Sequence, residues 1–496
     1  MNKDLLENKL NEIINQYSLG RKKVAVYGTG ILASDIFSVL KKLEIDIPFF
    51  MDRENTGVLH NLPVVKYSEV SDSFDAVIIS SLIYQDVIVE NLVDVFGSEY
   101  EIIKLLPEKD WNAVKDEHLD FTKKTILFVK EGLHIRVQKL SLALKKYSDY
   151  NTILVTQNPA DLIDSAFDKV YVYKSERGLR HLLRILDADI CFAYDLPAKV
   201  PRIVIECVSY PVVYAMHDSP PSDWEGLKPE AKGYTTKDDP DVDFVLRNAD
   251  GITYKGLELE WFRDKYKIPA YELVFNCYVM EEFFPIPCTK LSAGDGDIHV
   301  VQGGGVFSMK KDKQQWCDSQ YLNIARIFTD NKIHYHLYPA AILSSEDYSD
   351  YYEFDSECEY FHFHTPLSYN DFVRELPKYD FAVPIHETRF KWDKPVWFDS
   401  ILPSKIFAYI ESGLPILTNL KCIGDFVEKY KIGKLVPLDE LCNIGKIIRD
   451  LDVIELNKNL LSARENLNIS NYINDMCGFI CNVLQSGNLD VKNYAD

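Results

Sequence analysis

Along most of the chain, short runs of hydrophobic residues alternate with longer stretches in which hydrophobic and polar residues follow helical spacing. In the first hundred residues, apolar runs typical of buried strands lie at 23–27, 48–51, 76–80 and 101–105. Helical spacing covers 31–43 and 85–96 between them. Strands that alternate with helices predict a parallel sheet in a doubly wound fold.

The same alternation begins again near Lys124 and a third time near Ile298. The second series has strand runs at 124–129, 152–155, 170–173, 190–194, 212–216, 251–254 and 272–275, with helical spacing at 135–147, 177–186, 240–249 and 256–266. The third has strand runs at 298–302, 332–338, 359–363, 380–383, 414–418 and 434–436, with helical spacing at 312–328, 404–412 and 422–430.

These patterns predict an α/β protein of three Rossmann-like units. The stretch 285–297 is rich in proline and glycine and is typical of a linker, and the tail, about 454–486, is helical. We expect domains at 1–118, 119–290 and 291–496, with the last two facing each other across a cleft.

The composition and charge of the chain disfavour several classes of protein. The 496 residues carry 76 acidic and 55 basic side chains, a net charge of −21 that disfavours a nucleic-acid or anionic-membrane binder. Ten cysteines without a CxxC pair fit a reducing compartment. The first 20 residues predict an amphipathic helix rather than a signal peptide, and no apolar run approaches about 18 residues. We therefore expect a cytoplasmic protein.

A glycine turn follows the first strand run. Gly28, Thr29 and Gly30 lead into helical spacing, and Asp52 ends the second strand run. Such a turn lets backbone N–H groups meet a phosphate, and an acid at the next strand end can bind a ribose hydroxyl. The sequence favours a nucleotide as ligand here; the alternative is that the glycines only allow a helix to pack closely on a strand.

The first unit also resembles the small Rossmann domain at the start of bacterial sugar acyltransferases. The matching segments are VAVYGTG, IPFFMD, Gly57, LPVV and FDAVIIS. The resemblance implies a nucleotide or nucleotide-sugar module more than a dehydrogenase, and no Tyr-x-x-x-Lys pair accompanies it.

The sharpest motif of the third unit is LPSKIFAYIESGLPIL at 402–417. Ser404 is a candidate N-cap and Gly413 a candidate C-cap of a short helix. The N–H groups near Pro403, Ser404 and Lys405 can cradle a diphosphate, with Lys405 as counter-charge. The alternative is a well-capped helix with no ligand.

This stretch resembles the donor-site segment of GT-B glycosyltransferases of the family-four type, with its P-x-K-x-x-E-Y-x-x-x-G-x-P pattern. IGDFV at 423–427, GKLVP at 433–437, ADGI at 249–252 and VFNC at 274–277 also resemble family elements in the expected order. The resemblance spans about 124–486. It implies a twin-domain fold with a C-terminal helical tail, a nucleotide-sugar donor, a glycan or protein acceptor, and no cofactor.

The chain departs from the family where carboxylates are expected. The glutamate that resemblance places five residues before Gly413 is Ala408, and its partner acid falls on Ser400. Asp399 and Glu387 lie nearby but out of register. These departures leave open a donor site without a ribose clamp, or a degenerate enzyme.

Further candidate site residues lie in the loops that follow predicted strands of the second and third units. For the donor phosphates they are Gly304, Gly305, Lys310, Lys311 and Arg389. For the acceptor hydroxyl they are His217, Asp218 and Glu131.

Two histidine pairs are candidate metal ligands. His334 with His336, and His362 with His364, each share a strand face. Both pairs lie in aromatic strands, where histidine is usually structural, so the sequence favours no metal site.

The sequence thus favours a glycosyltransferase of surface-polysaccharide or glycoprotein assembly. One alternative is a non-catalytic binding or chaperone-like subunit, which Ala408 and Ser400 motivate. Another is an NAD(P)-dependent sugar-modifying enzyme centred on Gly28, Gly30 and Asp52. The sugar, the acceptor and the oligomeric state are not encoded in these patterns.

Overall fold

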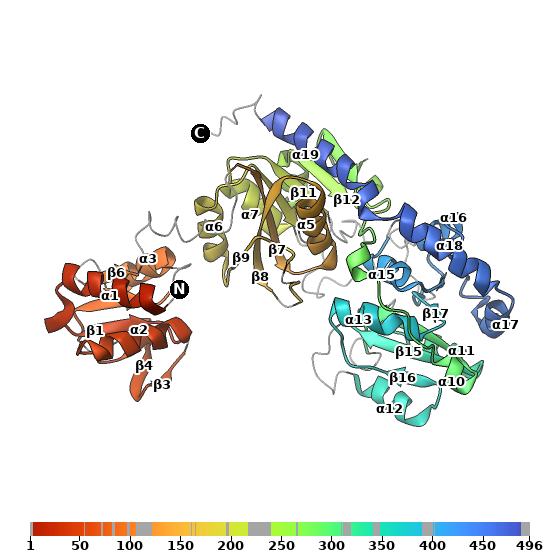
Figure 1. Ribbon diagram of the computed structural model, residues 1–496, viewed down its shortest axis with the longest axis horizontal. Coiled ribbons are helices and arrows are strands. Elements are labelled where there is room, and N and C mark those ends of the chain that lie inside the picture. Colours follow the sequence, from red (N-terminus) through yellow and green to blue (C-terminus); the bar gives the residue numbers. More distant parts are fainter. Residues whose placement is uncertain are drawn as a thin grey trace. The chain divides into compact units, whose positions relative to one another are not determined.

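The computed structural model contains three sheets (Figure 1). It describes residues 3–53, 55–70, 73–81, 85–96, 100–105, 122–159, 161–163, 165–194, 198–216, 240–263, 266–308, 310, 319–340, 348–388, 400 and 402–487. Within these residues no helix is both long and apolar enough to cross a membrane. The chain forms two compact units: unit 1 comprises Met1–Asp120 with Tyr173–Ile185, and unit 2 comprises Phe121–Val172 with Leu186–Asp496.

Unit 1 holds a six-stranded sheet in the order β3-β4-β2-β1-β5-β6. Its strands are β1 (Val24–Tyr27), β2 (Phe50–Asp52), β3 (Gly57–Leu59), β4 (Leu62–Lys66), β5 (Ala76–Ile79) and β6 (Glu101–Lys104). Its helices are α1 (Lys3–Gln16), α2 (Ile31–Lys42), α3 (Gln85–Phe96) and α6 (Glu176–Ile185). All neighbouring strands run parallel except β3 and β4.

The turn after β1 requires a glycine at position 28. Gly28 has a φ of +111°, and a Cβ there would lie 2.2 Å from the Oγ of Ser80. That Oγ donates a hydrogen bond to the carbonyl of Tyr27, so it has little freedom to move. Gly30, by contrast, opens α2 with a φ of −82° and open space around its Cα.

The second sheet, the first of unit 2, is seven-stranded and parallel in the order β13-β12-β11-β10-β7-β8-β9. Its strands are β7 (Lys124–Gly132), β8 (Tyr150–Asn158), β9 (Lys169–Val172), β10 (Ile190–Tyr194), β11 (Val212–Ala215), β12 (Gly251–Tyr254) and β13 (Tyr271–Val274). Its helices are α5 (Ile135–Tyr147), α7 (Lys199–Cys207), α8 (Pro240–Asn248) and α9 (Glu260–Arg263). Central strands β10 and β11 are buried on both faces, which explains their unbroken apolar runs.

The third sheet is parallel in the order β16-β15-β14-β17-β18-β19. Its strands are β14 (Ile298–Gly304), β15 (Ile333–Pro339), β16 (Phe361–Phe363), β17 (Phe381–Ala382), β18 (Ile416–Thr418) and β19 (Gly433–Leu435). Its helices are α10 (Ser292–Asp295), α11 (Leu322–Asp330), α12 (Ser349–Glu357), α13 (Tyr369–Glu375), α15 (Ser404–Ser412), α16 (Lys421–Lys429) and α17 (Ile444–Arg449).

The C-terminal tail joins the two sheets of unit 2. Helix α18 (Val453–Asn466) packs on α15, and α19 (Ile473–Gly487) packs on α5 and β13 (Figure 1). One hydrophobic cluster accordingly contains residues of both sheets and of the tail, among them Phe128, Phe407 and Ile480. The second and third sheets therefore share a core.

The structure confirms the predicted fold class, three α/β sheets with the last two in a GT-B-like pair and a helical tail. The domain boundaries 1–118, 119–290 and 291–496 stay predictions. Two element predictions were wrong: among the described residues of 256–266 only Glu260–Arg263 form an α-helix, and the 285–297 linker contains α10. The acidic segment Ser349–Glu357 forms helix α12, in which Asp350 and Tyr351 are buried.

Candidate functional site

A cavity of about 270 Å³ lies in unit 2 where the carboxyl ends of β7 and β14 meet the first turns of α5 and α15. It is lined by Leu133, His134, Ile135, Gln138, Asp161, Gly303, Gly304, Tyr338, Pro339, Ala340, Leu367, Tyr369, Phe372, Ser404, Lys405 and Ala408. The carboxyl ends of parallel strands are where open α/β sheets bind ligands. The second sheet with its helices forms one lobe of unit 2, and the third sheet with its helices forms the other. We call this cavity the interlobe cavity.

Helix α15 presents its N-terminus to the interlobe cavity. Pro403, with extended backbone angles, is the N-cap, and Ser404 is the first helical residue. The predicted N-cap at Ser404 was therefore wrong, because the fixed φ of Pro403 sets the helix start one residue earlier. Pro403 supplies no side-chain acceptor for the first turn. The predicted C-cap, Gly413, is confirmed, with a φ of 72°.

Lys405 brings a positive charge to the same place. Its Nζ donates to the carbonyl oxygen of Gly303 over 3.1 Å and lies 3.5 Å from Nε2 of His386. Gly304, with a φ of +134°, lets the end of β14 approach this ammonium, since a Cβ there would lie 3.2 Å from Nζ. The glycine turn of β14 and the lysine of α15 are thus one structural feature.

The loop after β17 is anchored beside Lys405. The side-chain amide of Asn419 accepts a hydrogen bond from the N–H of His386 and donates one to the carbonyl of the same residue, both over 2.9 Å. Glu387, the next residue, is buried and is not among the cavity-lining residues. The anchor fixes the position of the His386 imidazole relative to the ammonium.

Helix α5 presents a second N-terminus to the interlobe cavity. His134 is its N-cap, and His134 Nδ1 accepts a hydrogen bond of 3.2 Å from the N–H of Arg136. Because Nδ1 is an acceptor, the neutral imidazole carries its proton on Nε2. His134 is therefore a hydrogen-bond donor at Nε2 rather than a base. Two helix N-termini and one lysine favour an anionic ligand in this cavity.

Among the described residues that line the interlobe cavity, Asp161 is the one acidic residue. It has a φ of 63°, a left-handed conformation that a non-glycine residue seldom adopts. Gln138 holds this segment in place: its Nε2 donates to the carbonyl of Asp161 and its Oε1 accepts from the N–H of Ile163. No sequence pattern marked Asp161.

The family's carboxylate positions hold no carboxylate here. Ala408 puts a methyl group on the cavity wall. Ser400 is buried, and its carbonyl accepts a hydrogen bond from the N–H of Leu257, a contact of the third sheet's lobe with the second sheet's lobe. The described part of α15 therefore offers no ribose clamp at the position that the resemblance gives.

One turn beyond Ala408, α15 carries a fully buried acid. Oε1 of Glu411 lies 2.6 Å from Nζ of Lys139 in α5, and the two side chains are 0% and 1% exposed. The same oxygen accepts the N–H of Met280, and the other accepts the hydroxyl of Tyr369 over 2.6 Å. This network ties the two helices whose N-termini form the site, and no local pattern in the sequence indicated it.

The other predicted site residues fall in three groups. Gly304, Pro403, Ser404 and Lys405 are brought together at the interlobe cavity. Lys310 is not, because its ammonium pairs with Glu353 on α12 over 2.7 Å. Glu131 is exposed on β7, and neither it nor Gly305 lines the cavity. His217, Asp218, Lys311, Arg389 and Asp399 lie outside the described residues.

In unit 1 the predicted nucleotide residues also lie together. The Thr29 hydroxyl donates to Oδ2 of Asp52 over 2.8 Å. The side-chain amide of Asn55 donates to Oγ1 of Thr29, and its backbone N–H donates to Oδ1 of Asp52. Both carboxylate oxygens of Asp52 therefore already stabilise the turn, which weakens the case for a ribose ligand there.

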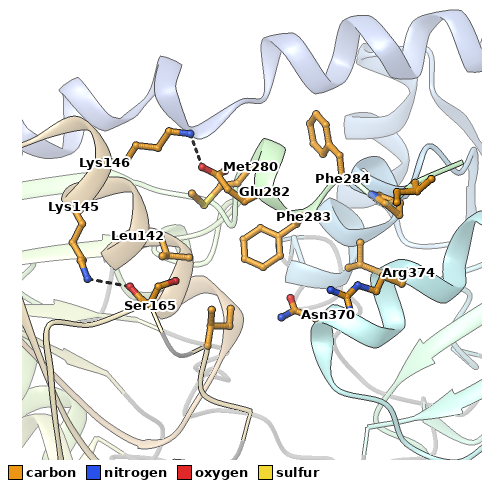
Figure 2. Close-up of a pocket in the computed structure, with 14 residues that line it drawn as sticks. Leu142, Lys145, Lys146, Ser165, Met280, Glu282, Phe283, Phe284, Asn370 and Arg374 are labelled. Atoms are coloured by element: carbon orange, nitrogen blue, oxygen red, sulfur yellow. Dashed lines mark hydrogen bonds and ion pairs between the residues drawn. The ribbon is translucent and has the colours of Figure 1, made fainter.

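A larger cavity of about 770 Å³ opens near the other end of α5 (Figure 2). Its wall combines Phe283 and Phe284 with charged side chains that have partners: Lys145 lies 2.9 Å from Asp168, and Lys146 pairs with Glu282. We place the candidate site in the smaller cavity, because Lys405 and the N-termini of α5 and α15 meet there.

Comparison with known proteins gives one family match. Residues 20–103 match the family described as C2185-like, N-terminal. No curated protein sequence matches the chain.

Several solved structures are similar over most of their length. UDP-GlcNAc 2-epimerase from Neisseria meningitidis, bound to UDP-GlcNAc, is 12% identical with a TM-score of 0.44, over 72% of this chain and 100% of that one. AviGT4, a glycosyltransferase of avilamycin A biosynthesis, is 12% identical with a TM-score of 0.46, over 73% and 98%. A trehalose-6-phosphate protein from E. coli, bound with UDP-2-fluoro glucose, is 9% identical with a TM-score of 0.48, over 73% and 99%.

Proposed function

We propose that unit 2 is a glycosyltransferase that binds a nucleotide-sugar in the interlobe cavity and transfers the sugar to a hydroxyl of a glycan or protein acceptor. The observation that carries this proposal is the convergence of Lys405 with the N-termini of α5 and α15 on one cavity. The resemblance of 402–417 to the GT-B donor-site segment supports the proposal, because it implies a donor diphosphate at the same helix.

Transfer of the sugar requires the protein mainly to stabilise the negative charge that develops on the leaving diphosphate. The bond between the anomeric carbon and the diphosphate oxygen breaks, and its electron pair leaves on the diphosphate. Lys405 and the two helix N-termini stabilise that developing charge. His134, as a donor at Nε2, adds a hydrogen bond to the phosphates or the sugar.

Asp161 is our candidate base for the acceptor. Its carboxylate takes the proton of the acceptor hydroxyl while the acceptor oxygen forms the new bond to the anomeric carbon. The Gln138 anchor holds the 161–163 segment in one conformation, as a positioned base requires. The role that the sequence gave to His217, Asp218 and Glu131 therefore has a further candidate in the described part of the chain.

Calorimetric titration with a panel of nucleoside diphosphates and nucleotide-sugars tests the proposal. Lys405→Met removes the charge at the cavity, and Lys421→Met removes a lysine paired with Asp425 on the surface of α16. We expect one donor to bind to wild type and Lys421→Met alike, and at least about tenfold more weakly to Lys405→Met. Equal binding to all three proteins would contradict the proposal, as would no binding by any compound.

A second candidate function is a binding subunit that kept the fold without turnover. It is favoured by Ala408 on the cavity wall, where the family has a glutamate. It predicts donor binding that depends on Lys405 without release of nucleoside diphosphate in the presence of any acceptor. Measured turnover that falls in Lys405→Met would eliminate it.

Assembly of surface polysaccharide or glycoprotein in the cytoplasm is the setting we propose for the enzyme.

A further inference from the structure

Five histidines gather on one face of the third sheet, along its strands β14, β15 and β16. They are His299 on β14, His334 and His336 on β15, His362 on β16, and His364 just after it. In the parallel register His299 lies opposite His334, and His336 lies opposite His362. Both pairs of rings stack with centroids 4.3 Å apart.

The Nδ1 atoms of His299 and His334 lie within hydrogen-bond distance of His336 and His362. Nδ1 of His299 lies 3.0 Å from Nε2 of His336, and Nδ1 of His334 lies 2.9 Å from Nε2 of His362. Nδ1 of His336 in turn lies 2.9 Å from Nε2 of His364. Because these contacts occupy Nδ1, they orient His299 and His334 so that both Nε2 atoms point the same way.

Both Nε2 atoms point toward acids of the segment that precedes β14. Nε2 of His299 lies 2.9 Å from Oδ2 of Asp295, and Nε2 of His334 lies 3.8 Å from Oδ2 of Asp297. The N–H of Asp297 bonds the other oxygen of Asp295 and orients that carboxylate. One ligand atom each from Asp295, His299 and His334 lies within 4.8 Å of the other two.

We propose that Asp295, His299 and His334 bind a divalent transition-metal ion of the zinc class, with Asp297 as a fourth ligand. Two imidazole nitrogens with carboxylate oxygens are typical of Zn²⁺, whereas Mg²⁺ and Ca²⁺ take oxygen ligands. Outer hydrogen bonds that fix each imidazole, as His336 and His362 provide here, accompany metal-binding histidines.

Burial and charge agree with this assignment. The His299 and His334 side chains are largely buried, while those of Asp295 and Asp297 are each 45% exposed, so an ion can enter from solvent and meet preset imidazoles. The two carboxylates balance the charge of a dication.

The ligands also suggest what the ion does. Asp295 ends α10 and Asp297 precedes β14, whereas His334 belongs to β15. An ion held by all of them fastens the segment between the second and third sheets to the third sheet. This role is independent of donor binding at Lys405.

Titration of the metal-stripped full chain with Zn²⁺ and Co²⁺ tests the site, with Mg²⁺ as reference ion. Asp295→Asn and His334→Gln each remove a ligand, and His60→Gln removes an exposed histidine of unit 1. We expect one tight site for Zn²⁺ and Co²⁺ in wild type and His60→Gln, with a raised melting temperature, and at least about tenfold weaker binding in the other two variants.

The Co²⁺ spectrum separates this site from the cysteines. A histidine–carboxylate site lacks the intense thiolate-to-metal absorption that cysteine ligands give. Thiolate absorption from the tight ion, affinity unchanged in Asp295→Asn, or no binding of either ion would overturn the proposal. Circular dichroism of the metal-free variants checks their fold, and the half-exposed Asp295 gives an answer should His334→Gln fail to fold.

Discussion

Nζ of Lys139 in α5 lies 2.6 Å from Oε1 of Glu411 in α15, and both side chains are removed from solvent. Every charged atom of the pair has protein partners: the ammonium also donates to the carbonyl of Tyr278 and lies over the rings of Phe283 and Tyr369. The pair therefore fixes the two helices whose N-termini face the interlobe cavity.

Breaking this pair should destabilise the protein more than removing both charges. Glu411→Gln or Lys139→Met alone leaves one buried charge uncompensated, which costs about 3–5 kcal/mol. The double variant leaves neither charge and should lose less stability than either single variant. Chemical denaturation followed by circular dichroism measures the three values. Single variants as stable as wild type would show that the pair does not hold the two lobes.

Asp161→Asn should slow transfer without weakening donor binding. The amide keeps the size of the side chain but cannot accept the acceptor proton, and loss of a positioned base costs about 10²–10⁴-fold in rate. Nucleoside diphosphate release gives the rate, and calorimetry gives the donor affinity. The matched control is Asp450→Asn, an exposed acid at the end of α17. A full rate in Asp161→Asn would remove this residue from the mechanism.

Unit 1 can be perturbed separately through its turn. Gly28→Ala places a Cβ 2.2 Å from Ser80 Oγ in a backbone conformation that favours glycine, so we expect a lower melting temperature for unit 1. Gly30→Ala, with open space around it, should be tolerated. Nucleotide-sugar binding should survive in both variants. Loss of that binding in Gly28→Ala would instead locate the nucleotide in unit 1, as the NAD(P)-dependent alternative requires.

The histidine cluster predicts a loss of stability in acid. Burial, reinforced by neighbouring imidazoles, lowers the pKa of His364 to about 4 and that of His336 further. Below a pH of about 6.5 these imidazoles bind protons in the unfolded chain but stay unprotonated in the folded protein. Stability is therefore complete above pH 6.5 and falls as the pH drops toward 4, by less than about 1.4 kcal/mol per pH unit for each histidine.

Denaturation midpoints at pH 7.5 and 5.5, in the presence of a chelator, measure this loss. His364→Gln removes one partly buried imidazole, so the stability of this variant should fall less between the two pH values than that of wild type. His60→Gln, which lacks only an exposed histidine, should match wild type. Equal losses in His364→Gln and wild type would argue against a lowered pKa of His364 in the folded protein.

The sequence predicted the sheets well because each central strand is buried on both faces and each amphipathic helix covers one of them. The strands at 190–194 and 251–254 were placed to the residue. Helix α7 was missed because buried Val200, Ile203 and Val204 lie among further apolar residues, which hides the helical period. The hairpin of β3 and β4 was missed because Val58 and Pro63 are exposed at a sheet edge.

The candidate site was predicted in part, for a physical reason. Lys405 belongs to a local motif, so its place at a helix N-terminus follows from nearby residues. Asp161, Glu411 and His299 gain their surroundings from residues distant in sequence: Gln138 for the first, Lys139 for the second, and His336 for the third. No local pattern carries that information.

A crystal of the full chain soaked with the nucleotide-sugar that binds best tests the central claim most directly. We predict density for the diphosphate in the interlobe cavity, within hydrogen-bond reach of Lys405 Nζ and of the first turns of α5 and α15. The same ligand at the turn of Gly28 and Asp52, with the interlobe cavity empty, would contradict the account.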